Sequence, residues 1–196
     1  MITKVAAFDF DGTLTKKDTL IHFIKFCFGS KRLYQGLAFL SPTLLSFKLK
    51  IITNDNAKQK LFSYFFKGMT LACFNKLGSD YQNEIDKILR PDAYNKLQWH
   101  LRNKHEVLIV SASVENWIVP WAASKNIKTV LATQIETNNG ALTGRFKSKN
   151  CYGIEKAKRL KDVLQNIDSY ELYAYGDTRG DKEMLMLADY KFYRCF

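Results

Sequence analysis

Two aspartates near the start of the chain, Asp9 and Asp11, have the residue type and spacing that most clearly indicate chemistry. They follow a short apolar run, residues 5–8, which predicts a buried strand. Because alternate strand residues share a face, both carboxylates project the same way where the strand ends, and Gly12 allows a sharp turn beside them. Two carboxylates ~4 Å apart repel by roughly 4 kcal/mol at an effective dielectric of ~20. A divalent cation would offset that repulsion and attract a phosphate.

Further polar residues follow other predicted strands. Ser111 follows the apolar run 107–110, and Asp177 follows the strand predicted over 170–175. Strands that alternate with helices predict parallel β-α-β units, in which ligands bind at the carboxyl ends of the strands. We therefore expect the aspartates and the serine to meet in one crevice.

The elements that must position these residues are strands and helices at both ends of the chain, with helices alone between them. Asn138-Asn139-Gly140 predicts a hairpin turn, and residues 30–89 show no strand pattern. The expected fold is α/β, with a doubly wound, mostly parallel sheet. Residues 1–16 and 90–196 would form the catalytic core, and residues 17–89 an inserted all-helical cap. The predicted strands are 4–10, 107–110, 129–132, 170–175 and 190–195, and the predicted helices outside residues 30–89 are 18–28, 91–104, 114–125, 154–165 and 181–187.

Four short motifs in order resemble those of the haloacid dehalogenase superfamily of phosphatases. They are Asp9-Phe10-Asp11-Gly12-Thr13, Val110-Ser111-Ala112-Ser113, Gly153-Ile154-Glu155-Lys156 and Gly176-Asp177-Thr178-Arg179-Gly180-Asp181. The helical block between the first two motifs is similar to the cap of the phosphoserine-phosphatase-like branch. The resemblance covers nearly the whole chain and implies a Rossmann-like hydrolase core.

The resemblance also implies residue roles. Asp9 would be the nucleophile that becomes an aspartyl phosphate, and Asp11 the general acid and base. An Asp9 oxygen, the Asp11 backbone carbonyl and Asp177 would hold Mg²⁺, with Asp181 binding directly or through water. The residues that would bind phosphate beside Asp9 are Gly12, Thr13, Ser111, Ala112 and Lys156.

The positions that would select the substrate differ from those of phosphoserine phosphatases. Asp18 stands where those enzymes carry a Glu for the substrate amine. Lys60 lies near the position where those enzymes carry an Arg that would bind the substrate carboxylate. Gly180 stands where an Asn is usual. These departures weaken the case for phosphoserine as the substrate.

The stretch 33–47 carries no charged residue, and basic residues flank it. Because it is short and interrupted by Pro42, it is not expected to span a bilayer. One interpretation is a pair of cap helices that pack on each other. The other is an interfacial patch that enters lipid while its basic flanks meet acidic head groups. The arrangement resembles phosphatidylglycerophosphate phosphatases of the same branch, which makes a lipid phosphate monoester a candidate substrate.

Composition and net charge limit the classes of molecule that the chain is expected to bind. The chain has a net charge of +11, yet no block of five or six basic residues, so we expect a phosphorylated small molecule or an anionic phospholipid and no nucleic acid. Four widely spaced cysteines suggest free thiols, and the first strand begins too early for a signal peptide. The expected location is the cytoplasm, with peripheral contact at the inner face of the membrane as an extension.

The leading functional hypothesis is a Mg²⁺-dependent phosphomonoester hydrolase acting through an aspartyl phosphate. Phosphoserine phosphatase-like or phosphotransferase activity would use the same residues. From another class, a non-catalytic protein that binds a phosphorylated ligand or a membrane surface stays open, although every catalytic position is filled.

Overall fold

A five-stranded parallel sheet lies at the centre of the molecule. The structure is a computed structural model that describes residues 2–196, with every side chain among them except that at position 168. The strand order is β3-β2-β1-β6-β7, and each neighbouring pair is parallel, as predicted. The strands are β1 (Thr3–Phe8), β2 (Glu106–Val114), β3 (Thr129–Thr133), β6 (Tyr170–Gly176) and β7 (Tyr190–Tyr193). Two further strands, β4 (Ile135–Asn138) and β5 (Ala141–Phe146), form the predicted hairpin.

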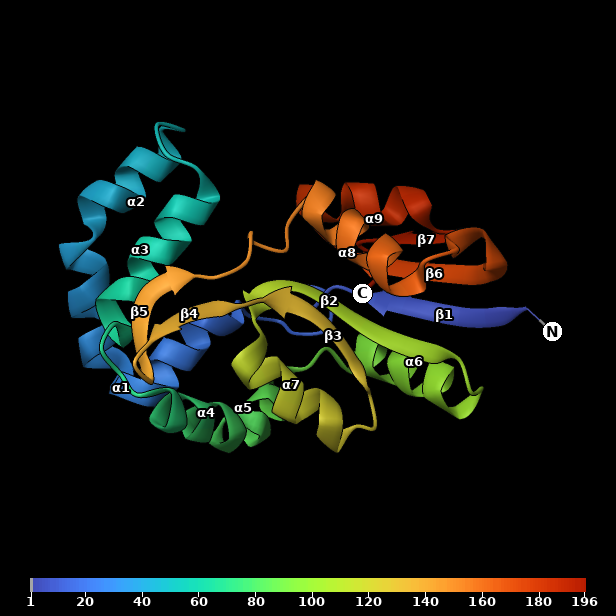
Figure 1. Cartoon of the computed structure of the whole chain (residues 1–196), viewed down its shortest axis with the longest axis horizontal. Coiled ribbons are helices and arrows are strands. Elements are labelled where there is room, and N and C mark those ends of the chain that lie inside the picture. Colours follow the sequence, from blue (N-terminus) through green and yellow to red (C-terminus); the bar gives the residue numbers. More distant parts are fainter. Residues whose placement is uncertain (1) are drawn as a thin grey trace.

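Helices cover both faces of the sheet (Figure 1). Strand β1 shows why, because its side chains alternate between two apolar clusters. Val5 and Ala7 pack on the side of α8 and α9, whereas Ala6 and Phe8 face the cluster that includes α6 and α7. The doubly wound arrangement therefore follows directly from an unbroken run of buried residues. These helices are α6 (Pro91–Arg102), α7 (Glu115–Ser124), α8 (Ile154–Leu164) and α9 (Lys182–Leu187); the 3₁₀ turns are η1 (Ile167–Ser169) and η2 (Arg179–Asp181).

Five helices lie between β1 and α6, in the region expected to be all-helical. They are α1 (Thr19–Phe39), α2 (Ser41–Lys48), α3 (Asn54–Phe66), α4 (Leu71–Asp80) and α5 (Gln82–Ile88). The β4–β5 hairpin lies against this segment, because Gly68 N donates to Leu142 O and Leu71 N donates to Gly140 O, each at 2.8 Å. The domain boundaries at residues 16 and 90 stay a prediction.

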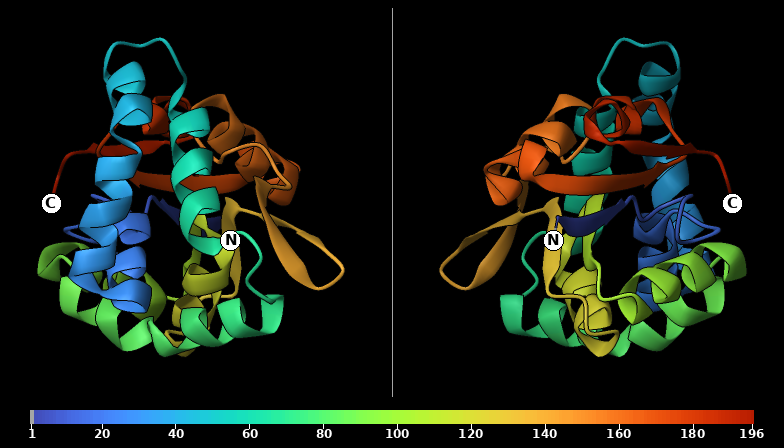
Figure 2. Two further views of the ribbon diagram at one scale, coloured as in Figure 1. Left: turned by 90° about the vertical axis from the view of Figure 1, so that its left-hand side faces the viewer. Right: turned by 90° about the vertical axis from the view of Figure 1, so that its right-hand side faces the viewer.

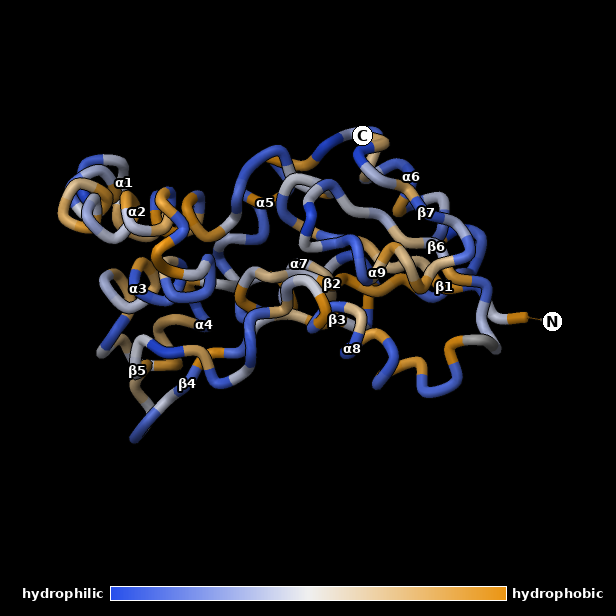
Figure 3. Tube along the Cα trace, turned by 90° about the horizontal axis from the view of Figure 1, so that it is seen from above, coloured by the Kyte–Doolittle hydropathy of each residue, from blue (hydrophilic) through white to orange (hydrophobic). Residues whose placement is uncertain are grey.

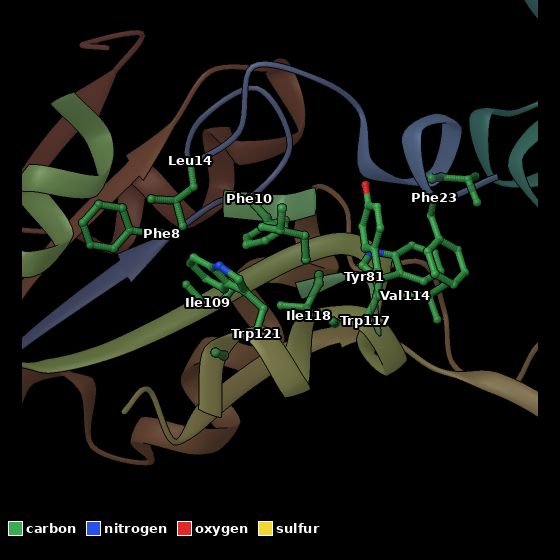
Figure 4. Close-up of a cluster of buried hydrophobic side chains, with 14 of the residues drawn as sticks. Phe8, Phe10, Leu14, Phe23, Tyr81, Ile109, Val114, Trp117, Ile118 and Trp121 are labelled. Atoms are coloured by element: carbon green, nitrogen blue, oxygen red, sulfur yellow. The ribbon is translucent and has the colours of Figure 1, made fainter. Parts of the chain in front are cut away.

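An aromatic cluster joins the helical segment to the sheet domain (Figure 4). The ring of Phe23 on α1 lies 4.6 Å from that of Trp117 on α7, 5.0 Å from Tyr81 and 5.6 Å from Phe66, between ring centroids. All four side chains are buried. Aromatic pairs at these distances stabilise beyond their buried area, so the base of the helical segment is held firmly against the core.

Two elements extend further than their sequence pattern indicated. Helix α1 was predicted to end at residue 28, but it continues to Phe39. It has a kink at Gly29, where a φ of 77° interrupts the helical geometry. Strand β2 continues past Ser111 to Val114, which pairs with Thr133 after an irregularity in the register. A polar residue inside a strand does not end it when the neighbouring strand still offers backbone partners.

The hydropathy of the chain follows this arrangement (Figure 3). Hydrophobic residues run along the central strands and also along α1 and α2 at one end of the molecule. Among residues 2–196, no helix combines the length and the apolar character needed to cross a membrane. All four cysteines are free thiols, and Cys151 is buried.

Candidate active site

Three aspartates meet at the carboxyl ends of the two central strands. Asp9 continues β1, and its backbone N donates to Tyr175 O of β6 at 2.9 Å. This pairing places Asp9 beside the loop that carries Asp177 and Asp181. One carboxylate oxygen from each aspartate lies within 4.8 Å of the other two. The expected convergence of residues 9 and 177, which are distant in sequence, is therefore present.

The turn after β1 requires glycine and fixes a threonine. Gly12 has a φ of 86°, and a Cβ atom there would lie 2.4 Å from an oxygen of Asp177. The hydroxyl of Thr13 lies 3.0 Å from Asp9 Oδ2 and 3.1 Å from Asp177 Oδ1, so its one proton is shared between two carboxylates. The first motif thus makes direct contact with the fourth.

Lys156 is the cation of this cluster. It lies in the first turn of α8 and is almost fully buried, with Nζ donating to Asp9 Oδ1 at 2.5 Å and to Asp181 Oδ1 at 2.6 Å. Burial alone would lower the pKa of Lys156, but the two carboxylates raise it above its usual value. Burial raises the pKa of Asp9 to about 7 even though Lys156 opposes that shift. One ammonium therefore does not offset both the burial of Asp9 and the negative charge of the neighbouring Asp181 and Asp11.

Asp181 is oriented by its own turn. Its Oδ2 accepts hydrogen bonds from the backbone N of Thr178 at 2.9 Å and of Asp177 at 3.2 Å, as well as from the Thr178 hydroxyl. The bond from Thr178 N is one half of a capping box at the start of η2, and the other half is a backbone N–H that donates to the Thr178 hydroxyl oxygen. The other oxygen of Asp181 is left to face Lys156, so the loop geometry sets the direction of the carboxylate.

Asp11 points into a different environment. Its Oδ1 accepts from Thr19 N at 2.9 Å, and its Oδ2 accepts a short hydrogen bond from the Ser113 hydroxyl. Burial raises the pKa of Asp11 to about 6, and the charge of Asp18 adds to the shift. The sequence did not indicate Thr19 or Ser113 as partners, because Ser113 lies 102 positions away on another strand.

Ser111 lies at the same edge of the sheet, on β2 beside β1. It is buried, and its Oγ accepts from Ser113 N at 3.0 Å. The hydroxyl hydrogen is therefore free to donate into the adjoining pocket. Ala112 turns its carbonyl toward Lys58 Nζ at 2.6 Å and the Thr133 hydroxyl at 2.8 Å.

A pocket of about 280 Å³ opens above these groups. Its floor is polar, whereas its walls are mainly apolar residues of the helical segment. Tyr152 and Thr178 also line it, and neither was predicted as a site residue. The pocket is lined by Asp9, Asp11, Asp18, Leu20, Ile21, Leu44, Phe47, Asn54, Ala57, Lys58, Leu61, Ser111, Ala112, Tyr152, Lys156 and Thr178.

Of the two residues predicted to select the substrate, one lies in the pocket and the other does not. Asp18 caps α1 and lines the pocket. Lys60 is exposed and does not line the pocket, whereas Lys58 does. Residues 58 and 60 are ~200° apart around a helix, so a shift of two positions moves a side chain to the opposite face. Thr53 caps α3 and fixes its register with Ala57, Lys58 and Leu61 toward the pocket.

Comparison with known proteins identifies the family. The profile of the haloacid dehalogenase-like hydrolases matches residues 6–186. The chain belongs to this family. It is also similar to Protein CicA of Caulobacter vibrioides, at 32% identity over 98% of this chain and 86% of that protein. A more distant relative is phosphoserine phosphatase SerB1 of Mycobacterium tuberculosis, at 24% identity over 95% of this chain and 63% of that protein.

Solved structures share the fold of this hydrolase. A Bordetella pertussis protein described as having unknown function superposes with a TM-score of 0.81 and 17% identity, over 95% of this chain and 87% of that one. A phosphoserine phosphatase in its apo form gives a TM-score of 0.67 and 16% identity, over 97% of this chain and 86% of that one. These likenesses confirm the predicted α/β fold with its mostly parallel, Rossmann-like sheet. They leave the resemblance to phosphatidylglycerophosphate phosphatases as a hypothesis.

Proposed function

We propose that this protein is a Mg²⁺-dependent phosphatase that hydrolyses phosphomonoesters through an aspartyl phosphate on Asp9. The supporting observation is the pairing of Asp9 with Lys156 within a group of three carboxylates, of which Asp9 and Asp181 are buried, directly under a pocket. The Lys156 ammonium orients this carboxylate and opposes the rise in its pKa that burial causes, and a bound Mg²⁺ would favour the ionised form further. The same positive charges would favour an anionic phosphoryl group. The phosphoserine phosphatase SerB1 among the relatives supports phosphate ester hydrolysis as the reaction class.

The donor set fits a hard divalent cation. Asp9, Asp177 and Asp181 offer carboxylate oxygens within 4.8 Å of one another, and a single lysine leaves negative charge uncompensated. Carboxylate oxygens are the ligands that Mg²⁺ takes in proteins. We expect these residues, with the Asp11 backbone carbonyl, to hold the ion. When bound, Mg²⁺ would neutralise charge on the transferring phosphoryl group.

The side chains divide the remaining work. Asp9 attacks phosphorus, and the bond from phosphorus to the leaving oxygen breaks. Asp11 gives its proton to that oxygen; a pKa of about 6 makes it a suitable acid near neutral pH. Ionised Asp11 then takes a proton from water, whose oxygen attacks phosphorus and releases Asp9 and inorganic phosphate. Ser111 and Lys156 bind the phosphoryl oxygens, together with Gly12, Thr13 and Ala112.

The pocket walls support a leaving group with an apolar part. Leu20, Ile21, Leu44 and Phe47 line the space above the aspartates. A lipid phosphate monoester, of the phosphatidylglycerophosphate kind, would place its phosphate on Asp9 and its glyceryl and acyl portion along these side chains. Its hydrolysis at the inner face of the membrane is the specific form of the proposal.

A small zwitterionic phosphate ester such as phosphoserine is the second candidate. Asp18 and Lys58 both line the pocket, and they could pair with an amine and a carboxylate. Lys offers a single point charge where an Arg would bind a carboxylate through two hydrogen bonds, which favours the amphiphilic ester. Transfer of the phosphoryl group to an alcohol instead of water would use the same aspartyl phosphate.

The decisive experiment measures phosphate release from a panel of phosphorylated metabolites, phosphoserine and phosphatidylglycerophosphate in detergent. We expect Mg²⁺-dependent release that falls at least ~10³-fold in Asp9→Asn, with the fold intact by circular dichroism. Asp162→Asn, an exposed carboxylate on α8, is the matched control and keeps its activity. Equal turnover in Asp9→Asn and the wild type would remove Asp9 as the nucleophile. A protein that binds these esters without turnover would be the non-catalytic alternative.

A further inference from the structure

We propose that residues 45–51, here called the tip, dock this protein on an anionic lipid bilayer. The tip comprises the end of α2 and the turn toward α3, and that turn forms the outer end of the helical segment (Figure 2). Leu45, Leu49 and Ile51 are 57%, 62% and 71% exposed. Single exposed apolar residues are common on proteins, but three within seven positions at a projecting end indicate a contact surface.

The tip is a built structure. Backbone N of Leu49 donates to Leu45 O, that of Lys50 to Phe47 O and that of Ile51 to Ser46 O, each at 2.9 Å. None of the eight residues of α2, all of which are described, is buried, so no apolar side chain of α2 is fully enclosed by the helical segment. The apolar residues of the turn are thus presented outward on a hydrogen-bonded backbone.

The charge of the tip selects the occupant. Lys48 and Lys50 alternate with the exposed leucine and isoleucine, and residues 30–54 contain no Asp or Glu. Apolar insertion combined with basic residues gives binding to acidic lipid that neither feature gives alone. Lysine stems can lie along the lipid while the ammonium groups reach the phosphates. A second copy of this chain would bring the same positive charges together, which opposes self-association through the tip.

The tip is continuous with the active-site pocket. Leu44 and Phe47 of α2 line the pocket on one side of the turn, and Asn54 at the start of α3 lines it on the other. A bilayer in contact with the tip would lie beside the pocket walls made by α2. The docking does not depend on the proposed phosphatase activity, whereas delivery of a lipid phosphate to Asp9 rests on that function.

Flotation with vesicles tests the proposal. The wild-type chain is mixed with vesicles of phosphatidylcholine alone, or of phosphatidylcholine with about 30 mol% phosphatidylglycerol, which gives the vesicles a negative surface. We expect binding to the acidic vesicles that weakens in high salt, because surface charge is screened there. Leu49→Ser/Ile51→Ser and, separately, Lys48→Glu/Lys50→Glu should each reduce the bound fraction by about tenfold or more.

Controls separate docking from folding and catalysis. Ile2→Ser/Val163→Ser removes two exposed apolar side chains outside the tip and should float like the wild type. Asp9→Asn should also bind the acidic vesicles, even if the proposed catalysis is wrong. Phosphate release from a water-soluble ester should be unchanged in Leu49→Ser/Ile51→Ser. The proposal would be overturned if the wild type did not bind the vesicles, or if both tip variants bound them as strongly as the wild type. A dimer that Leu49→Ser/Ile51→Ser abolishes would assign the tip to self-association instead.

Discussion

The carboxyl edge of the sheet and the tip of the helical segment differ in which side chains they expose to water and which they bury. At the sheet edge, Asp9, Lys156 and Asp181 are buried charges whose oxygens and nitrogens are nearly all paired. At the tip, Leu49 and Ile51 are apolar side chains left in water. Each region is costly by itself: buried charges lose hydration, and exposed apolar groups order water. The first cost is offset in part by Lys156 and, as proposed, further by Mg²⁺, and we propose that lipid offsets the second.

The comparison shows where the fold fixes chemistry and where it leaves freedom. Strand ends place Asp9 and Asp177 through backbone pairing, so their positions follow from the sheet itself. The helical segment contributes pocket walls from α1, α2 and α3, whose side chains can change without disturbing the sheet. We therefore expect reaction chemistry to depend on the sheet edge and substrate choice on the helices.

The largest effect is expected from breaking the charge balance at the sheet edge. Lys156→Met leaves Asp9 and Asp181 without their shared cation. Removing one partner of a buried ion pair costs roughly 3 kcal/mol or more in the free energy of unfolding, and turnover should fall by ~10² to 10³-fold. Urea denaturation and phosphate release measure the two losses.

The neighbouring Lys158 provides a matched control, since it is exposed on the same helix. Lys158→Met should leave both stability and turnover near the wild-type values. If Lys156→Met behaved like Lys158→Met, the buried ion pairs would contribute little, and the contrast between the two regions would fail.

An intermediate effect is expected from magnesium. Because the three carboxylates carry more negative charge than Lys156 offsets, Mg²⁺ at about 100 times its dissociation constant should stabilise the fold by ~2.7 kcal/mol. That corresponds to a rise in Tm of roughly 5–10 °C for a chain of this size. Asp177→Asn should lose this rise, while Asp162→Asn should keep it. A Tm indifferent to Mg²⁺ in the wild type would contradict the metal site.

A smaller effect is expected on the helical side. Lys58 lines the pocket and holds the Ala112 carbonyl, so Lys58→Met should raise KM by about tenfold, equivalent to ~1.4 kcal/mol. Lys60→Met lies two positions away on the exposed face and should not change KM. Steady-state kinetics with one chosen phosphomonoester compare the two variants. A larger change for Lys60 than for Lys58 would return the specificity role to the position first predicted.

The sequence was sufficient where short-range rules decide the outcome. Apolar runs located β1 and β6, and the expectation of parallel β-α-β units placed Asp9 and Asp177, which follow those strands, at one edge of the sheet. It was insufficient where the partner is remote or the helix register matters. The contact of Asp11 with Ser113 joins a turn to another strand, and nothing local to either residue encodes it. The choice of Lys58 over Lys60 depends on where Thr53 begins α3, an uncertainty of two residues that reverses the face.

The most direct test of the central claim is to trap the phosphoryl group on the protein. The wild-type chain is incubated with Mg²⁺ and a ³²P-labelled phosphomonoester that it hydrolyses, and is then quenched in acid. One portion is counted for protein-bound ³²P; the other is reduced with borohydride, which releases the phosphate and converts a phosphorylated aspartate to homoserine, and is then digested and mapped by mass spectrometry. We expect an acid-stable label that is lost in alkali, homoserine at position 9 after reduction, and neither signal in Asp9→Asn. A label on Asp11, or full turnover with no labelled protein at any quench time, would contradict the assignment of Asp9.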